Sequence, residues 1–192
     1  MRQVARGLVD AASVDRLELV RHGSSTRAWS EATAWAAVAL LSGVTPDWLG
    51  PSQRSRLKGR LRQMDAAALV ERARGRASVT RYGAHDSTSN RLLGILVYAP
   101  DASRNPGLTA SSAIDGYLDA SDLAGVVSRH GLERDDAGRV TLRATGMDLD
   151  TVRQLAGAGV VLTALDLAES LDARERRAGL GALDQALEEQ RG

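Results

Sequence analysis

The chain has no cysteine and no phenylalanine, and it has only three tryptophans and three tyrosines among 192 residues. The absence of cysteine excludes disulfides, thiol catalysis and cysteine-ligated zinc. So few aromatic side chains disfavour a surface on which the bases of single-stranded nucleic acid would stack. Lysine is also nearly absent, because Lys58 is the only one.

Long apolar runs are missing as well. The longest, residues 34–41, is far shorter than the roughly 20 residues that a membrane span requires. The first 20 residues carry charge throughout and lack the apolar core of a signal peptide. We therefore expect a cytoplasmic protein with no membrane partner, and a chain of this length needs no metal or disulfide to be stable.

Charge is distributed unevenly although the net charge is +1. Residues 51–81 contain nine basic and two acidic side chains, whereas residues 101–192 contain 10 basic and 16 acidic ones. A basic block followed by an acidic half suggests a polyanion-binding module joined to a part with another role. The alternative is a solvated, arginine-rich helix.

Within the basic block, helix signals come first. Ser30 is expected to cap a buried helix over 31–42, and a short helical turn is predicted at 45–49. Residues 52–64 form the next predicted helix, in which Leu57, Leu61 and Met64 share one apolar edge. Two basic rows flank this edge: Arg54, Lys58 and Arg62 on one side, and Arg56 and Arg60 on the other.

A hairpin is predicted next, since two strand-like runs, 69–73 and 77–82, surround Arg74-Gly75-Arg76. This order of elements predicts a winged helix-turn-helix. The string LKGRLRQMDAAALVERARGRASVTRY resembles bacterial winged-helix repressors, and the resemblance implies a recognition helix in the major groove and a wing on the adjacent backbone or minor groove. Arginine suits both roles. The predicted DNA-binding residues are Ser52, Gln53, Arg54, Ser55, Arg56, Lys58, Arg60, Arg62, Arg72, Arg74, Arg76 and Arg81. The alternative is an internal helix and hairpin that merely expose arginines.

The second half alternates helices and a strand. A short helix is predicted at 89–97 and a loop at 102–112, followed by helices at 121–130, 148–156 and 172–189, a strand at 139–144 and an apolar segment at 160–170. We expect a mixed α/β, mainly helical protein, with an N-terminal winged helix and a small α+β or α/β C-terminal domain. The expected divisions are an amphipathic extension (1–28), the winged helix (29–86), a linker (87–110) and the C-terminal domain (111–192).

The strings DGYLDASDLAGVVSRHGL, GRVTLRAT and VVLTALDLAESLDARERRAGLGAL resemble the C-terminal domain of actinobacterial AbiEi-type antitoxins. The resemblance covers roughly residues 30–190 and implies a regulator that binds its own promoter, represses its operon and counteracts a nucleotidyltransferase-like toxin. Residues 1–28 have no counterpart in that family, and the second helix of the predicted helix-turn-helix is unusually short.

A toxin of this type would present a basic cleft, which the acidic half would complement. The predicted partner-binding residues are Asp166, Glu169, Asp172 and Glu175. The alternative is an acidic, solvated surface. The expected partners are double-stranded DNA and a cognate toxin protein. The sequence is also compatible with a homo-oligomer.

Two enzyme classes share short strings with this sequence. LELVRHGSST (17–26) is similar to the signature of histidine phosphatases, but residues 1–20 are periodic like a helix, and His22 and His130 are expected to be helix-terminal histidines. A nucleotidyltransferase would need Gly23-Ser24 close to a pair of carboxylates that holds Mg²⁺. The candidate pair, Asp148 and Asp150, lies in the opposite half of the chain and is better explained as acidic residues at the start of a helix.

The three histidines lack metal-ligand spacing. The sequence thus predicts no enzyme, no catalytic or metal site and no cofactor. Two alternatives remain: a winged-helix repressor with an unrelated dimerisation or effector domain, and a histidine-phosphatase-like enzyme acting through His22.

Overall fold

The computed structural model describes residues 3–5, 8–9, 27–98 and 114–192. Its centre is a four-stranded sheet in the order β4-β6-β3-β5. The strands are β3 (Ser78–Gly83), β4 (Ile114–Asp119), β5 (Glu133–Arg134) and β6 (Val140–Thr145). Strand β3 runs antiparallel to β6 and β5, whereas β4 runs parallel to β6.

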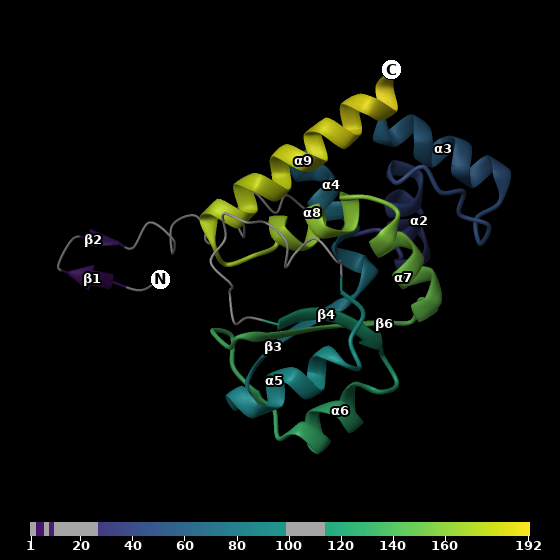
Figure 1. The fold of residues 1–192 in the computed structure, drawn as a ribbon. Helices are drawn as coiled ribbons and strands as arrows, with labels where there is room; N and C mark the ends of the chain where they lie inside the picture. Colours follow the sequence, from purple (N-terminus) through teal and green to yellow (C-terminus); the bar gives the residue numbers. More distant parts are fainter. Residues whose placement is uncertain (1–2, 6–7, 10–26, 99–113) are drawn as a thin grey trace.

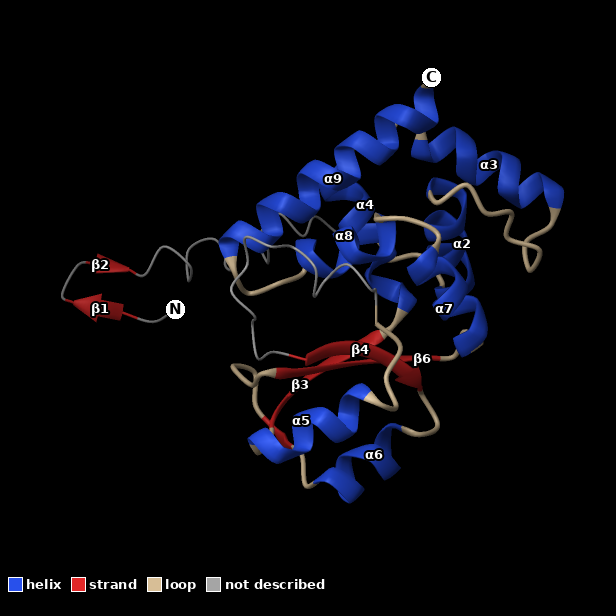
Figure 2. Ribbon diagram, in the orientation of Figure 1, coloured by secondary structure: helices blue, strands red, loops and turns tan. Residues whose placement is uncertain are grey.

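Helices cover both faces of this sheet (Figure 1). One face carries α5 (Asp86–Leu93) and α6 (Leu123–His130). The other carries α2 (Glu31–Leu41), α3 (Pro51–Leu61), α4 (Ala66–Ala73), the 3₁₀ turn η1 (Arg74–Arg76), α7 (Leu149–Gly157), α8 (Val161–Ala168) and α9 (Ala173–Arg191). Figure 2 shows the resulting three layers, with the strands between the two groups of helices.

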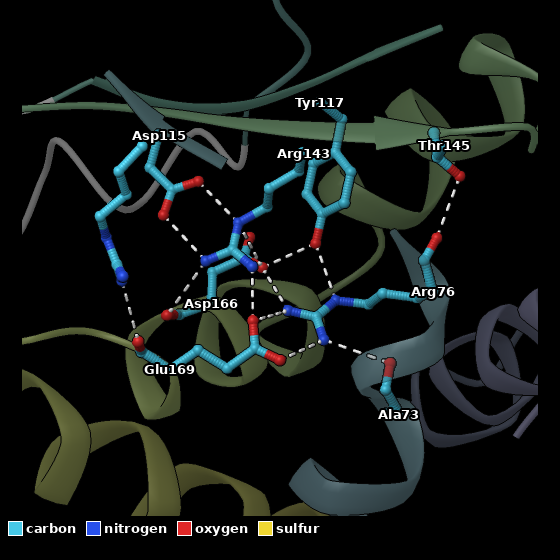
Figure 3. Close-up of polar contacts among 9 residues, drawn as sticks. Ala73, Arg76, Asp115, Tyr117, Arg143, Thr145, Asp166 and Glu169 are labelled. Atoms are coloured by element: carbon cyan, nitrogen blue, oxygen red, sulfur yellow. Dashed lines mark hydrogen bonds and ion pairs between the residues drawn. The ribbon is translucent and has the colours of Figure 1, made fainter. Parts of the chain in front are cut away.

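The two faces of the sheet differ in chemistry because side chains alternate along a strand. On β6, Leu142 faces α5 and α6 and belongs to an apolar cluster with Leu92 and Val126. Its neighbour Arg143 points to the opposite face, toward the larger helical layer (Figure 3). That layer has its own core, in which Trp35 and Leu165 are fully buried. The sheet therefore presents a polar face to the larger helical layer.

The mixed α/β, mainly helical class is confirmed, and most predicted elements are present to within a few residues. Ser30 is the N-cap of α2, and the side chain of Asp148 caps α7 by accepting a hydrogen bond of 2.9 Å from the backbone N–H of Thr151. Gly131 ends α6 with a left-handed φ of 58°, a conformation that glycine adopts readily.

The predicted hairpin around Arg74-Gly75-Arg76 is wrong. Residues 69–73 belong to α4, and Arg74–Arg76 form η1 instead of a hairpin tip. The side chain of Asp65 caps α4, accepting a 2.7 Å hydrogen bond from the backbone N–H of Ala68. Leu69 and Ala73, four residues apart, are both buried, so this run forms the apolar stripe of a helix and not a strand. The wing expected at this position is absent from the described residues.

Several boundaries also differ from expectation. The short helical turn predicted at 45–49 is a turn at 47–48 without a helix, and α5 begins at Asp86 rather than at 89. Near the N-terminus, β1 (Gln3–Ala5) and β2 (Leu8–Val9) form an antiparallel pair where helical periodicity was expected. The remainder of 1–26 and the loop predicted at 102–112 lie outside the described residues.

The expected winged-helix and C-terminal segments share structure. Strand β3, from the first segment, pairs with β6, from the second. Their helices share one buried cluster that includes Trp35 of α2 and Leu183 of α9. The boundaries predicted at 86 and 111 therefore run through a common sheet and a common core. Among the described helices, none is long and apolar enough to span a membrane.

Candidate nucleic-acid interface

Helix α3 is the most basic exposed element that the structure describes. Together with its C-cap Arg62 it carries five cations and no acidic residue. Only Leu57 and Leu61 of this helix are buried, and they join the core formed with α2 and α4. Because one narrow edge packs inward, most of the circumference of α3 faces outward.

Both ends of α3 are fixed by hydrogen bonds. At the start, Pro51 occupies the first helical position, and the side chain of Gln53 accepts a 3.1 Å hydrogen bond from the backbone N–H of Gly50. At the end, the guanidinium of Arg191 donates to the carbonyls of Arg62 and Met64, at 3.0 and 2.7 Å. The last turn of α9 therefore caps the basic helix from the far end of the chain.

The cations of α3 differ in how far they are already neutralised. Arg54 donates to the carbonyl of Pro46 at 3.3 Å and lies 3.8 Å from the carboxylate of Asp47. Lys58, Arg60 and Arg62 are exposed, and the described residues provide them with no acidic partner. These three charges are therefore available to an anion outside the chain.

The structure divides the predicted DNA-binding residues into two groups. Eight lie together on α3 and its C-cap: Ser52, Gln53, Arg54, Ser55, Arg56, Lys58, Arg60 and Arg62. The other four lie outside α3 and contact other residues of the chain. Arg72 donates to the carbonyl of Arg27 at 3.4 Å, Arg74 pairs with Glu71 at 3.2 Å, and Arg81 donates to the carbonyl of Glu169 at 3.3 Å.

Arg76 is the clearest departure from expectation, since 1% of its surface is exposed. Its guanidinium forms two hydrogen bonds with the carboxylate of Glu169, at 2.8 and 2.7 Å, and one with Asp166 at 2.8 Å. Its Nε donates to the hydroxyl of Tyr117 at 2.8 Å (Figure 3). An enclosed guanidinium with this many partners is not a DNA contact, so its assignment to a wing is wrong.

Arg143 of β6 completes the cluster from the sheet side. It donates to both oxygens of Asp115, at 2.6 and 2.9 Å, and to Glu169 at 2.5 Å. The hydroxyl of Tyr117 donates to Asp166 at 2.6 Å. Paired and hydrogen-bonded charges of this kind are what an interior tolerates. We refer to Arg76, Asp115, Tyr117, Arg143, Asp166 and Glu169 as the ion cluster.

The charges in the ion cluster shift the pKa values of its acids in different directions. Burial opposes ionisation of Glu169, but the guanidinium groups of Arg76 and Arg143 outweigh it and lower its pKa from 4.5 to about 2. Burial raises the pKa of Asp166 in spite of the same two arginines, and burial also raises the pKa of Tyr117. The cluster joins η1, β4, β6 and α8, and its groups hydrogen-bond to one another.

The acidic residues predicted to bind a partner are engaged within the chain. Asp166 and Glu169 belong to the ion cluster. Asp172 is the N-cap of α9, and the backbone N–H groups of Glu175 and Arg174 lower its pKa. The carboxylate of Glu175 accepts a hydrogen bond from the hydroxyl of Ser170. The four residues therefore do not form one free acidic surface.

Sequence reasoning missed Asp115, Tyr117 and Arg143. A signal was present in the strand predicted at 139–144, because strict alternation places Arg143 on the face opposite Val140, Leu142 and Ala144. An arginine in the middle of a strand between two helical layers indicates a buried ion pair. Its partners could not be identified, because they lie on β4 and at the C-cap of α8, 28 and 26 residues away along the chain.

The residues weighed for catalysis are dispersed. Asp148 caps α7, and His130 lies in the last turn of α6, where the interpretation as a helix-terminal histidine placed it. His22, Gly23 and Ser24 lie outside the described residues. Within the described part of the chain, no group of three or more histidine, aspartate or glutamate side chains is arranged to hold a metal ion.

No protein-family model, no curated protein and no solved structure matches this chain.

Proposed function

We propose that this protein binds double-stranded DNA through α3 and regulates transcription from its own promoter. The observation that carries the proposal is the set of exposed, unneutralised cations Lys58, Arg60 and Arg62 on a helix that carries no acidic residue. Cations on such a surface bind the phosphate backbone and release its counterions, which supplies most of the affinity of a non-specific complex.

The shape of α3 supports a duplex rather than a single strand. A helix with its side chains is about 10–12 Å wide, and the major groove of B-form DNA is about 12 Å wide. Binding to single strands relies on stacking against aromatic rings, and α3 contains none. The aromatic residue that precedes the helix, Trp48, is partly exposed, but its indole N–H is already used in a 3.0 Å hydrogen bond to the carbonyl of Ala32.

The proposal is confined to DNA. A toxin partner was expected from the resemblance to antitoxins and from the acidic half of the chain. Of the four residues assigned to it, Asp166 and Glu169 are paired with Arg76 and Arg143.

The test is duplex binding as a function of salt, measured by fluorescence anisotropy with labelled DNA from upstream of the gene. The variant replaces Lys58, Arg60 and Arg62 with alanine, since these side chains contribute little to the fold. The logarithm of the wild-type affinity should fall linearly with the logarithm of salt concentration, with a slope of about −0.9 per phosphate contact. The variant should lose affinity for every duplex and show a slope smaller by about one for each contact removed.

A matched control removes three other exposed arginines: Arg129 on α6, Arg134 on β5 and Arg177 on α9. This control changes the net charge by the same amount and leaves every side chain of α3 in place. It should bind nearly as tightly as the wild type. Equal losses in the two triple variants would mean that overall charge, not α3, attracts the DNA, and the proposal would be wrong.

A further inference from the structure

The outward face of α3 is organised in three lines. At about 100° per residue, the line opposite the buried edge of Leu57 and Leu61 contains Ser52, Ser55 and Gly59. Gln63 follows in the turn directly after the C-cap Arg62. All four positions are exposed and uncharged. The cations lie beside this line, not on it: Arg54, Lys58 and Arg62 on one side, and Arg56 and Arg60 on the other.

This arrangement matches the charge pattern of a DNA groove, where uncharged base edges lie between two rows of phosphates. We infer that α3 enters the major groove with Ser52, Ser55, Gly59 and Gln63 facing the base edges, and with each basic row facing one phosphate strand. The inference rests on the proposed DNA binding and adds which residues read the sequence. It differs from the expectation drawn from the sequence, in which the arginines contact both base edges and phosphates.

The chemistry of the uncharged line fits that role. Serine hydroxyls can donate to and accept from base edges, and a glutamine amide can pair with the N6 and N7 atoms of adenine. Gly59 has open space where a Cβ would lie, so no contact within the described chain requires glycine there. With no side chain at its centre, the line allows the backbone of α3 to approach the floor of the groove.

Gly59 alone does not mark a site. Gly125 on α6 and Gly181 on α9 are also exposed and helical, and a Cβ added at either would meet no described atom within 4 Å. What distinguishes Gly59 is its place between two basic rows. The other two glycines therefore provide controls for the same substitution.

Other duplex sites fit this surface less well. The minor groove of B-form DNA is about 6 Å wide and does not admit a helix. The major groove of double-stranded RNA is deep and too narrow for side chains to read. The proposed occupant is therefore the major groove of DNA, with a contact of about five base pairs, because 11 residues of helix span about 16 Å.

The experiment selects duplexes from a random DNA library with the full chain and with two variants. Gly59→Leu places a bulky side chain at the centre of the line, and Gly181→Leu makes the same change on α9. Circular dichroism and thermal unfolding verify that both variants fold. Leucine is a better helix former than glycine, so neither variant should unfold at a lower temperature than the wild type.

The wild type should enrich a contiguous motif of about five base pairs. Gly59→Leu should lose that motif and lower the ratio of specific to non-specific affinity at least about tenfold, the effect of removing a base contact. Its salt slope on random duplex should stay unchanged, because the phosphate contacts remain. Gly181→Leu should keep both the motif and the ratio.

Four results would overturn the inference. An unchanged motif and ratio in Gly59→Leu would mean that the uncharged line does not face the bases. Salt-dependent binding by the wild type without an enriched motif, or equal binding of duplex RNA, would leave duplex binding intact while removing sequence reading in the major groove. No binding of duplex DNA by the wild type would remove the proposed function as well.

Discussion

The guanidinium of Arg76 and the carboxylate of Glu169, 93 residues apart in the chain, are joined by two hydrogen bonds of 2.8 and 2.7 Å. The pair connects η1 to the C-cap of α8. It also removes two side chains from the surfaces to which they were assigned, one from DNA binding and one from partner binding. The remaining cations of α3 are the ones that the fold leaves exposed.

Arg74 and Arg76 should respond differently to the same substitution, although both belong to η1. Arg76→Ala should reduce the free energy of unfolding by about 3–5 kcal/mol, because it leaves Asp166 and Glu169 short of a buried partner. Arg74→Ala should change it by no more than about 0.5 kcal/mol, since Arg74 is exposed and pairs only with Glu71. Urea unfolding of both variants measures the difference, and equal effects would contradict the ion cluster.

The stabilising contribution of Glu169 should depend on pH. Its pKa in the folded chain is lowered from 4.5 to about 2, so its ionised form favours folding above about pH 4.5 and this contribution is lost as pH falls toward 2. Glu169→Gln should therefore destabilise the protein by about 3 kcal/mol at pH 7 and by progressively less below pH 4.5. Denaturant unfolding at several pH values measures this.

Asp166 contributes with the opposite sign, because its pKa is raised by burial. Its charged form is disfavoured in the folded chain, so this group favours folding at low pH and the advantage is lost as pH rises through its folded pKa. Asp166 is present in both proteins, so the comparison with Glu169→Gln reports the ionisation of Glu169 together with its effect on the arginines that the two acids share. A stability difference between wild type and variant that stays constant from pH 7 to 2 would be inconsistent with the lowered pKa.

Alanine substitutions at two glycines of α9 should distinguish the effect of close packing on stability from the effect of helix propensity. A Cβ at Gly179 would lie 2.5 Å from the carbonyl oxygen of Ala164 and 2.5 Å from the backbone nitrogen of Ala168, whereas one at Gly181 would meet nothing within 4 Å. Gly179→Ala should thus force α8 and α9 apart and lower stability by about 1–3 kcal/mol. Gly181→Ala should raise stability by about 0.5–1 kcal/mol. Thermal unfolding distinguishes them, and stabilisation by both would refute the close packing.

The sequence was informative wherever local signals act alone. Asp148 marks a helix start through its side-chain hydrogen bond and Gly131 marks a helix end through its left-handed backbone, and Ser30 is the N-cap of α2 without a side-chain capping bond. Each of these ends lies where it was predicted. The two basic rows and the apolar edge of α3 follow from helical periodicity, so its surface could also be derived in advance.

The errors arose where distant segments decide the structure. Residues 69–73 fit either a strand or a helix, and burial of Leu69 and Ala73 in the helical layer selects the helix. Arg76 was assigned to the surface because its buried acidic partners lie 90 and 93 residues further along the chain. Local patterns contain no information on contacts at that separation.

Chemical modification of Lys58 tests the central claim most directly, because the only lysine of the chain lies on the exposed face of α3. The rate of its acetylation, followed by mass spectrometry, can be compared with and without saturating duplex DNA of the selected sequence. Contact between α3 and DNA predicts that the duplex slows the reaction at least about tenfold at low salt, and that the protection disappears at salt concentrations that dissociate the complex. An equal rate of acetylation in the free protein and in the saturated complex would contradict it.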